Sequence, residues 1–364
     1  MDKLKSPNWF VKNPPIYDIT KSYAENAASG PFYTKVIPER KAVDKNNYIH
    51  FLGHAIKSPI GVAAGPLLNS NWINLAAQLG FDILTYKTIR SYKNQGHALP
   101  NMIYVNLKED HAVQIDMPHE TLEDLTLTNS FGMPSQSRDF LLYDIAKAKA
   151  SLVPGQVLIV SVVGSQTNDT SLLQDFIDTA LLAKEAGASI IEANFSCPNV
   201  AEMHSQLYLD PENVYQFAKA LKTAIAPLPL VIKVGNFPSY EHLKKVVIAA
   251  AKANVDAICG LNSLGRPVFT KDSQPALGIH RPTSGICGGQ IRKFALEFVQ
   301  NAFQVKKEEK LDITIMGVGG ITLAEHFDEF FKYGADIALC ATGMIFDPLL
   351  AYQYHSKRGI HAVG

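Results

Sequence analysis

The sequence is poor in cysteine, carries no net charge and contains no long apolar segment. Its four cysteines in 364 residues form no C-x-x-C pair, which argues against a disulfide framework and against a zinc or iron–sulfur site within the chain. Its 34 basic and 34 acidic side chains balance, so we expect neither nucleic acid nor an anionic membrane as the main partner. No stretch reaches about 18 uninterrupted apolar residues, and the first residues lack the apolar core of a secretory signal. We therefore expect a cytoplasmic protein that does not insert stably into membranes.

The chain also lacks a G-x-G-x-x-G motif after its first apolar run, which disfavours a dinucleotide-binding open sheet. Instead, short apolar runs alternate with amphipathic segments from Pro59 onward. The runs are Ile60–Ala64, Ile83–Thr88, Val157–Val163, Ser189–Ala193, Leu230–Val234, Ala257–Leu261, Ile313–Gly317 and Ile337–Ala341. Continuously apolar strands are typical of parallel sheets covered by helices. Eight such units predict an α/β fold, a (β/α)8 TIM barrel, with a doubly wound open sheet as the alternative.

Two segments lie outside this repeat. Residues 1–47 are polar and aromatic without helical periodicity, and we interpret them as an irregular N-terminal arm that packs on a barrel formed by residues 48–364. Ser91–Thr128 is an insertion that separates the second strand from its helix. A loop of that length is usually functional in a compact domain. On a barrel it would overhang the face where the strands end, and active sites are built on that face.

Polar residues gather where the predicted strands end, and those positions converge on one mouth of a barrel. They are Ala64 and Gly65 after the first strand, Lys87 and Thr88 on the second, Asn129, Gly132 and Met133 at the close of the insertion, Asn194, Cys197 and Asn199 after the fourth, Lys233 on the fifth, and Asn262 and Ser263 on the sixth. Cys197 stands between two carboxamides, so its thiol is a candidate base or nucleophile. Burying the charge of Lys233 without a partner is costly, which predicts an anionic or electron-rich ligand. Strand alternation places Glu192 on the same face as Asn194.

Glycine-rich segments follow the last strands. They are Ser284–Gly289, which opens a helix near Gln290, then Gly317–Gly320 after the seventh strand and Ala341–Gly343 after the eighth. Glycine loops in these places, beside a helix N-terminus, form the usual phosphate site of a barrel. The sequence therefore predicts a phosphorylated ligand.

Taken together, these motifs resemble the dihydroorotate dehydrogenase family, FMN-dependent barrels that oxidise dihydroorotate to orotate in pyrimidine biosynthesis. The resemblance runs from about Ser58 to Pro348. Its most specific segment is Asn194–Asn199, which is similar to the family pattern N-x-S-[CS]-P-N, and Asn129–Pro134 supports it. Cysteine at the base position resembles the soluble class of the family. The arm and the insertion are longer than in minimal soluble members, and Cys287 stands where the family often has glycine.

The resemblance implies a role for each candidate residue. Cys197 would be the general base that removes the C5 proton while hydride leaves C6 for flavin N5. Substrate would be bound by Lys87, Asn129, Gly132, Met133, Asn194, Asn199, Asn262 and Ser263. FMN would be bound by Ala64, Gly65, Lys87, Thr88, Lys233, Gly288, Gly319, Gly320 and Thr342. Lys233 would place positive charge at the N1/O2 edge of the flavin. The soluble relatives also imply a homodimer.

Other functions stay open at this point. The nearest is an FMN dehydrogenase of another reduced pyrimidine or cyclic amide. A phosphosugar lyase or isomerase would use the same barrel, but such enzymes tend to carry Asp or Glu at strand ends, where this chain has mostly Asn. A degenerate barrel that serves as a binding subunit is the third alternative, and Cys197 argues against it. The electron acceptor, whether fumarate, quinone or NAD through a partner subunit, is not encoded in these motifs.

Overall fold

The computed structural model describes residues 7–12, 14–196 and 203–358, and it contains a closed barrel of eight parallel strands. The barrel strands, in chain order, are β3 (Ile60–Val62), β4 (Ile83–Ile89), β8 (Val157–Val162), β9 (Ile190–Asn194), β10 (Leu230–Lys233), β11 (Ala257–Gly260), β14 (Thr314–Val318) and β15 (Ile337–Cys340). Each pairs in parallel with its neighbours in chain order, and β15 closes on β3. The predicted (β/α)8 barrel is confirmed, and all eight predicted strands are present.

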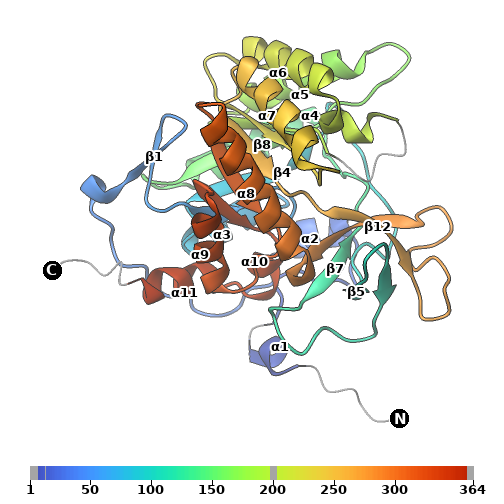
Figure 1. The fold of residues 1–364 in the computed structure, drawn as a ribbon. Helices are drawn as coiled ribbons and strands as arrows, with labels where there is room; N and C mark the ends of the chain where they lie inside the picture. The colour runs from blue at the N-terminus through green and yellow to red at the C-terminus, as the bar shows by residue number, and fades with distance from the viewer. Residues whose placement is uncertain (1–6, 13, 197–202, 359–364) are drawn as a thin grey trace, which may run out of the picture.

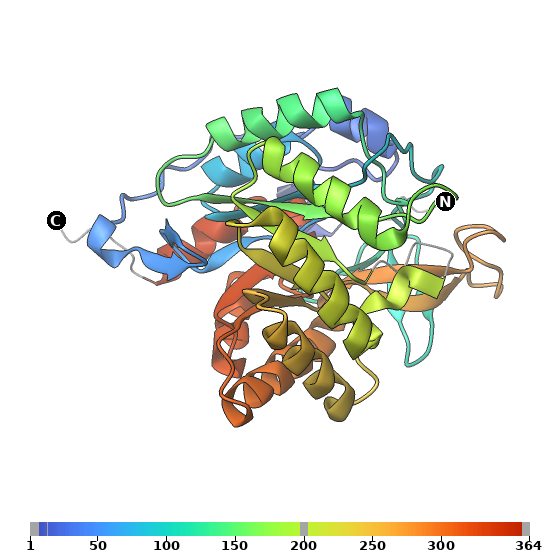
Figure 2. The same ribbon diagram turned by 90° about the horizontal axis from the view of Figure 1, so that it is seen from above.

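Helices surround the barrel, as Figure 1 and the view from above in Figure 2 show. They are α3 (Ser70–Gln78), α4 (Arg138–Ala150), α5 (Leu172–Glu185), α6 (Pro211–Ile225), α7 (Tyr240–Lys252), α8 (Arg292–Glu308), α9 (Ala324–Tyr333), α10 (Thr342–Phe346) and α11 (Leu350–Lys357), with 3-10 turns η2 (Met203–Leu209) and η3 (Gly289–Ile291). Several begin at residues whose side chains accept from the first turn: Ser171 from Gln174 N and Ser239 from His242 N. Such caps fix where each helix starts and therefore how long the loop before it is.

Two apolar cores of the described residues belong to the barrel and its helices, and a third, smaller one lies in the five-stranded sheet described below. Of the first two, the larger lies between the strands and the helices, and the smaller fills the barrel with side chains such as Ile159, Val231 and Met316. The hairpin of β1 (Ile49–Phe51) and β2 (His54–Ile56) adds Phe51 and Ile56 to the inner core. The hairpin therefore closes the amino-terminal end of the barrel, and the carboxyl-terminal end is left for a ligand.

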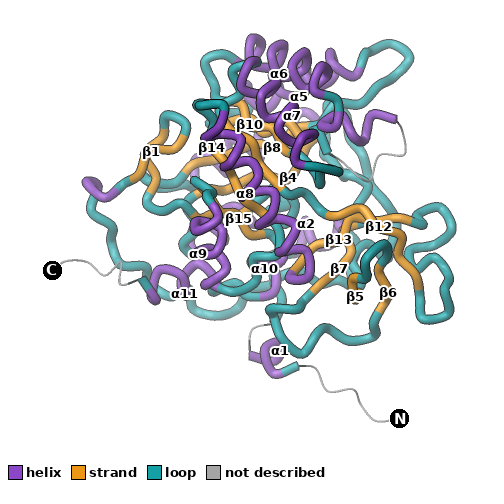
Figure 3. Tube along the Cα trace, in the orientation of Figure 1, coloured by secondary structure: helices purple, strands orange, loops and turns teal. Residues whose placement is uncertain are grey.

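The insertion differs from the sequence prediction, because it is not a structureless loop. It forms β5 (Val105–Leu107), β6 (Ala112–Gln114) and β7 (Thr126–Asn129). These pair with a hairpin of β12 (Leu264–Phe269) and β13 (Thr283–Gly288) in a five-stranded sheet of order β5-β6-β12-β13-β7. Figure 3 shows this sheet beside the barrel. The segment Ser284–Gly289, predicted as a glycine loop, is therefore mostly strand, because pairing with β7 extends its backbone.

The N-terminal segment also has more regular structure than predicted. It contains α1 (Asn8–Lys12), α2 (Tyr23–Ser29) and a 3-10 turn η1 (Lys45–Asn47). Ser22 and Glu25 form a capping box, which explains why a helix begins there despite weak periodicity. Backbone hydrogen bonds from Ile16 N to Ile345 O tie this segment to α10. Arg40 pairs with buried Asp82 at the opposite end of the barrel. The segment therefore packs along the barrel from one end to the other.

Candidate active site

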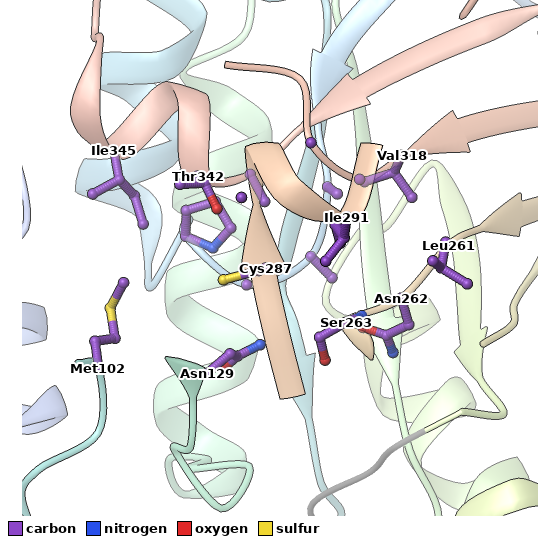
Figure 4. Close-up of a pocket in the computed structure, with 18 of the residues that line it drawn as sticks. Met102, Asn129, Leu261, Asn262, Ser263, Cys287, Ile291, Val318, Thr342 and Ile345 are labelled. Carbon is purple, nitrogen blue, oxygen red and sulfur yellow. Dashed lines mark hydrogen bonds between the residues drawn. The ribbon is translucent and has the colours of Figure 1, made fainter. Parts of the chain in front are cut away.

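A cavity of about 760 Å³, counted with the part open to solvent, lies at the carboxyl ends of the barrel strands. Its walls come from segments far apart in the sequence, including the N-terminal arm, the insertion and the loops after β3, β11, β14 and β15. Ten predicted site residues border it: Ala64, Gly65, Asn129, Lys233, Asn262, Ser263, Gly288, Gly319, Gly320 and Thr342. Figure 4 shows Asn129, Cys287 and Thr342 facing the same space as Asn262 and Ser263. These ten residues therefore line one cavity, and their roles toward a ligand stay predictions.

Carboxamides form a connected network on one side of the cavity. Asn262 Nδ2 donates to Ser196 O and Ser196 Oγ, each at 3.0 Å, and lies 3.4 Å from Asn194 Oδ1. Asn194 Oδ1 also accepts from Ser196 N at 3.2 Å. The Asn262 carbonyl oxygen accepts from Ser263 N at 2.8 Å. These bonds hold the end of β9 against the loop after β11, so the carboxamides are fixed before any ligand arrives.

Lys233 brings a positive charge to the wall of the cavity. Its side chain is nearly fully buried at the end of β10, and its Nζ lies 4.0 Å from Glu192 Oε2. Burial opposes the charged form of this lysine, but the attraction of Cys259 and Glu192 exceeds it and raises the pKa of Lys233. Burial also raises the pKa of the Cys259 thiol to about 12, so that thiol is neutral at physiological pH. Glu192 is therefore the anion that holds the ammonium.

Glycine backbone forms another part of the wall. Within the described residues, the N–H groups of Gly319 and Gly320 donate to no other backbone carbonyl. Thr342 begins α10, and the first N–H groups of a helix have no partner inside it. Backbone N–H groups that face a cavity and lack partners can bind an anion such as a phosphate. This part of the wall therefore offers donors of the kind that a phosphate needs, and phosphate binding here stays a prediction.

The loop after β3 leaves free space beside its backbone. A Cβ added to Gly65 would meet no atom within 4 Å, although Gly65 borders the cavity. Ala63, Ala64 and Pro66 continue the same wall with small or flat side chains. A planar ring system can therefore approach the backbone closely at this point.

Several predicted site residues do not border the cavity. Lys87 and Thr88 are buried on β4, where Thr88 Oγ1 lies 3.0 Å from Ser161 Oγ. Asn194 does not border the cavity either, and its Oδ1 lies 3.4 Å from Nδ2 of Asn262, which does. Gly132 and Met133 have positive φ angles of 67° and 56°, and neither borders the cavity. Their roles toward a ligand stay predictions.

The left-handed pair Gly132 and Met133 is nonetheless held firmly. Asn94 Nδ2 donates to both of their carbonyl oxygens at 2.9 Å, and Arg90 Nε donates to Met133 O at 3.3 Å. With the carbonyls bound on one side, successive N–H groups in such a turn form a concave donor site. Within the described part of the chain these two N–H groups donate to no backbone carbonyl. Asn94 carries no strand-end signal in the sequence, whereas Arg90 directly follows β4 and could have been found by that position.

Cys197 and Asn199 lie outside the residues that the structure describes. Ser196, which precedes Cys197 in the sequence, is held at three of its polar atoms by Asn194 and Asn262. The predicted base therefore follows directly on a segment that is fixed to the cavity wall.

Sequence reasoning missed the apolar part of the lining. Tyr17, Leu68, Met102, Phe131 and Ile345 border the cavity, and in Figure 4 Met102 and Ile345 lie across it from Leu261 and Val318. Tyr17 comes from the N-terminal arm, and no motif marked it. An apolar residue in an arm or insertion carries no sequence signal that distinguishes a cavity wall from ordinary core.

Cys287 also borders the cavity, near Thr342. Its Sγ lies 3.6 Å from Leu127 O. Burial raises the pKa of Cys287 to about 11, against a smaller opposite effect of Thr342. The thiol is therefore protonated at neutral pH, and Cys287 contributes to the wall as a small apolar side chain.

Comparison with known proteins agrees with this geometry. A family model described as dihydroorotate dehydrogenase matches residues 48–356. A dihydroorotate dehydrogenase of Dictyostelium discoideum is 42% identical over 363 residues, which cover 95% of this chain and 98% of that protein. The catalytic subunit of a dihydroorotate dehydrogenase B (NAD(+)) from Methanocella arvoryzae is 26% identical over 78% of this chain and 82% of its own. Subunit PreA of the NAD-dependent dihydropyrimidine dehydrogenase of Escherichia coli K12 is 31% identical, but over 53% of this chain and 46% of its own.

None of the helices in the described residues is both long and apolar enough to cross a membrane.

Proposed function

The chain belongs to the dihydroorotate dehydrogenase family, and on that premise we propose that it oxidises dihydroorotate to orotate with bound FMN. The observation that carries the proposal is the single cavity in which a lysine, two carboxamides and glycine backbone meet. The carboxamides suit a planar ring with amide groups, and the lysine with the glycine N–H groups suits a phosphorylated, electron-accepting cofactor.

The residues of the cavity fit FMN. Free space beside Gly65 accommodates a flat ring, and the N–H groups of Gly319 and Gly320, with the start of α10 at Thr342, suit its phosphate. Lys233 supplies a fixed positive charge toward the electron-rich edge of the ring. When bound, FMN supplies the acceptor for the hydride that leaves C6 of the substrate.

The protein's own residues bind and orient the pyrimidine. Asn129, Asn262 and Ser263 border the cavity and carry donors and acceptors for its ring amides and carbonyls, and Asn194 and Asn199 complete this set. The carboxylate of dihydroorotate requires a donor cluster as well. The N–H groups of Gly132 and Met133, with Lys87, fill that role in the proposal, and Asn94 fixes their carbonyl groups on the other side.

Cys197 is the base of the proposed reaction. Its sulfur takes the proton from C5 of the substrate, and the bond that this releases forms the ring double bond as hydride leaves C6. A positioned general base is worth a factor on the order of 10² to 10⁴ in rate. Asn262 and Asn194 hold Ser196, the residue that precedes Cys197 in the sequence.

The test is flavin reduction by substrate in the purified protein. We expect the protein to carry FMN and to be reduced by dihydroorotate in a single turnover. Cys197→Ala is expected to keep its flavin, but the rate at which dihydroorotate reduces that flavin should fall by a factor on the order of 10² to 10⁴. A colourless protein that takes up no added FMN contradicts the cofactor, and near-normal reduction in Cys197→Ala contradicts the base.

A dehydrogenase of another reduced pyrimidine is the second candidate. The similarity to a dihydropyrimidine dehydrogenase subunit favours it, although that similarity covers half of the chain. Dihydrouracil lacks the carboxylate of dihydroorotate, so comparing the two as reductants separates the candidates. Faster reduction by dihydrouracil would contradict the role proposed for Gly132 and Met133.

A homodimer and a cytoplasmic location are expectations from the sequence and the family resemblance. Sedimentation of the purified protein and cell fractionation test them directly.

A further inference from the structure

Glu192 is a carboxylate enclosed within the barrel. Its side chain has no exposed surface, and neither of its oxygens accepts a hydrogen bond from a nitrogen or hydroxyl group of the described residues; the thiol of Cys259, a weak donor, lies against it. Ile190, two residues earlier on β9, belongs to the inner core, so alternation directs Glu192 into the barrel as well. A buried carboxylate without strong hydrogen-bond partners is expensive to keep, because little compensates for its lost hydration. A purely structural role does not explain why a charge stands there.

Strand register places Glu192 on the strand next to that of Lys233 and two positions further from the mouth of the barrel. Glu192 is in register with Val231, and Lys233 is in register with Asn194. The two residues between these positions correspond to about 6 to 7 Å along the strand. Glu192 therefore lies one side-chain layer deeper than Lys233, away from the cavity. It does not border the cavity, so it cannot itself touch a ligand there.

The charged groups around Lys233 come from its two neighbouring strands. Glu192 lies on β9 at 4.0 Å from Nζ, and the thiol of Cys259, in register with Lys233, lies on β11. Cys259 is fully buried and its burial disfavours the thiolate. Among the described residues, Glu192 is therefore the one anion within ion-pair distance of this ammonium.

We propose that Glu192 is a positioning residue that keeps Lys233 protonated and directed at the cavity, where its charge meets the electron-rich edge of the bound flavin. This inference rests on the proposed function for the identity of the flavin, but not for the pairing of the two side chains. Without Glu192, the thiol of Cys259 alone would remain beside Lys233 among the described groups that oppose burial, and the lysine would lose its proton at a lower pH. A neutral amine no longer attracts an electron-rich ring edge.

The experiment measures the charge of Lys233 directly in the full-length protein as purified. Lysines carry a ¹³C label at Cε, and the Lys233 signal is identified by its loss in Lys233→Met. In the wild type we expect no titration of Lys233 up to the pH at which exposed lysines titrate. In Glu192→Gln the midpoint should fall by at least roughly one pH unit, because a nearby opposite charge in a buried site shifts a pKa by that much or more.

Two variants serve as controls. Glu192→Asp keeps an anion and should restore most of the wild-type midpoint. Asp82→Asn removes a different buried carboxylate, which pairs with Arg40 away from the cavity, and should leave the Lys233 midpoint unchanged. An unchanged midpoint in Glu192→Gln, or an equal shift in Asp82→Asn, would overturn the inference.

The bound flavin gives a second measurement. In Glu192→Gln its reduction potential should be lower than in the wild type at a pH above the Lys233 midpoint measured for that variant. The difference should change as the pH is taken below that midpoint, where Lys233 regains its proton. A potential that is equal to the wild-type value at both pH values contradicts the inference. A wild-type protein without flavin contradicts the proposed function instead, and the lysine titration remains interpretable.

A double variant covers the case in which Glu192→Gln does not fold. Breaking a buried ion pair leaves one uncompensated charge, whereas removing both charges avoids that cost. Glu192→Gln combined with Lys233→Met should therefore fold and be more stable than Glu192→Gln alone. Equal or lower stability of the double variant would show that the two side chains are not coupled.

Discussion

Replacing Gly288 with alanine puts a methyl group where the five-stranded sheet reaches the cavity. Gly288 ends β13, is in register with Thr126 of β7, and borders the cavity. Its backbone has φ 105° and ψ −168°, a conformation that is nearly restricted to glycine. A Cβ there would lie 2.1 Å from Leu125 O and 2.9 Å from Thr126 Cα. Both neighbours are backbone atoms, which cannot rotate away as the end of a side chain would.

Two costs add up in Gly288→Ala. Backbone strain of this kind is worth about 1 to 3 kcal/mol. Forcing a methyl group into a packed site costs about 1 to 3 kcal/mol more. We therefore expect the free energy of unfolding to fall by about 2 to 6 kcal/mol, or β13 and β7 to separate locally. Separation would move the cavity wall near Cys287, so flavin content should fall as well.

Gly187→Ala is the matched control. Gly187 has a similar φ of 98°, but a Cβ added to it would meet no atom within 4 Å. The control therefore carries the backbone strain alone, about 1 to 3 kcal/mol, and lies outside the cavity. Urea unfolding gives the two free energies, and visible absorbance gives the flavin per chain. If Gly288→Ala is no less stable than Gly187→Ala and keeps its flavin, the close approach of β13 to β7 described above is wrong.

Three further predictions follow from single contacts. Asn94→Leu removes two hydrogen bonds worth about 1 kcal/mol each, so the free energy of unfolding should fall by about 2 kcal/mol. KM for dihydroorotate should rise as well, because the turn at Gly132 and Met133 is no longer held, and an unchanged KM in steady-state kinetics contradicts this. Asp144→Ala leaves the Ser70 N–H, the Ser70 hydroxyl and the Tyr86 hydroxyl without their acceptor and should lower the free energy of unfolding in urea by about 3 to 5 kcal/mol. Burial, with a contribution from Arg40, lowers the pKa of His355 from its ordinary value of about 6.5 to about 4. Between these two pH values the unfolded chain therefore binds more protons than the folded protein. The contribution of His355 to stability should therefore be complete above about pH 6.5 and be lost as the pH falls toward 4, and His355→Gln should flatten that part of the stability profile.

The barrel and the polar part of the cavity were predictable because their signals are local. Each barrel strand is a short apolar run, and a polar residue directly after such a run must lie at the strand's carboxyl end. Parallel strands bring those ends to one face, so Asn262, Lys233 and Gly319 could be assigned to one site without knowledge of any contact. Lys87 and Thr88 mark the limit of this reasoning, since both lie on their strand and yet do not border the cavity.

The five-stranded sheet was not predictable by the same reasoning. Strands β5 and β6 have three residues each, too few to show a period. They pair with each other, and β6 also pairs with β12, whose residues lie more than 150 positions further along the chain. Such pairing depends on where the barrel has already placed the two segments. The glycine content of β13 predicted a loop, but antiparallel pairing with β7 gives this segment a strand conformation.

The sequence by itself determined the number and order of the barrel strands, the family motif around Cys197 and the residue types at the mouth. Each of these depends on residues that are close together in the sequence. The tertiary structure decided which side chains meet across the barrel. It placed Tyr17 of the arm in the cavity wall and set Glu192 beside Lys233. Neither contact has a sequence signal, because strand register and packing fix the distance between segments that are remote in the chain.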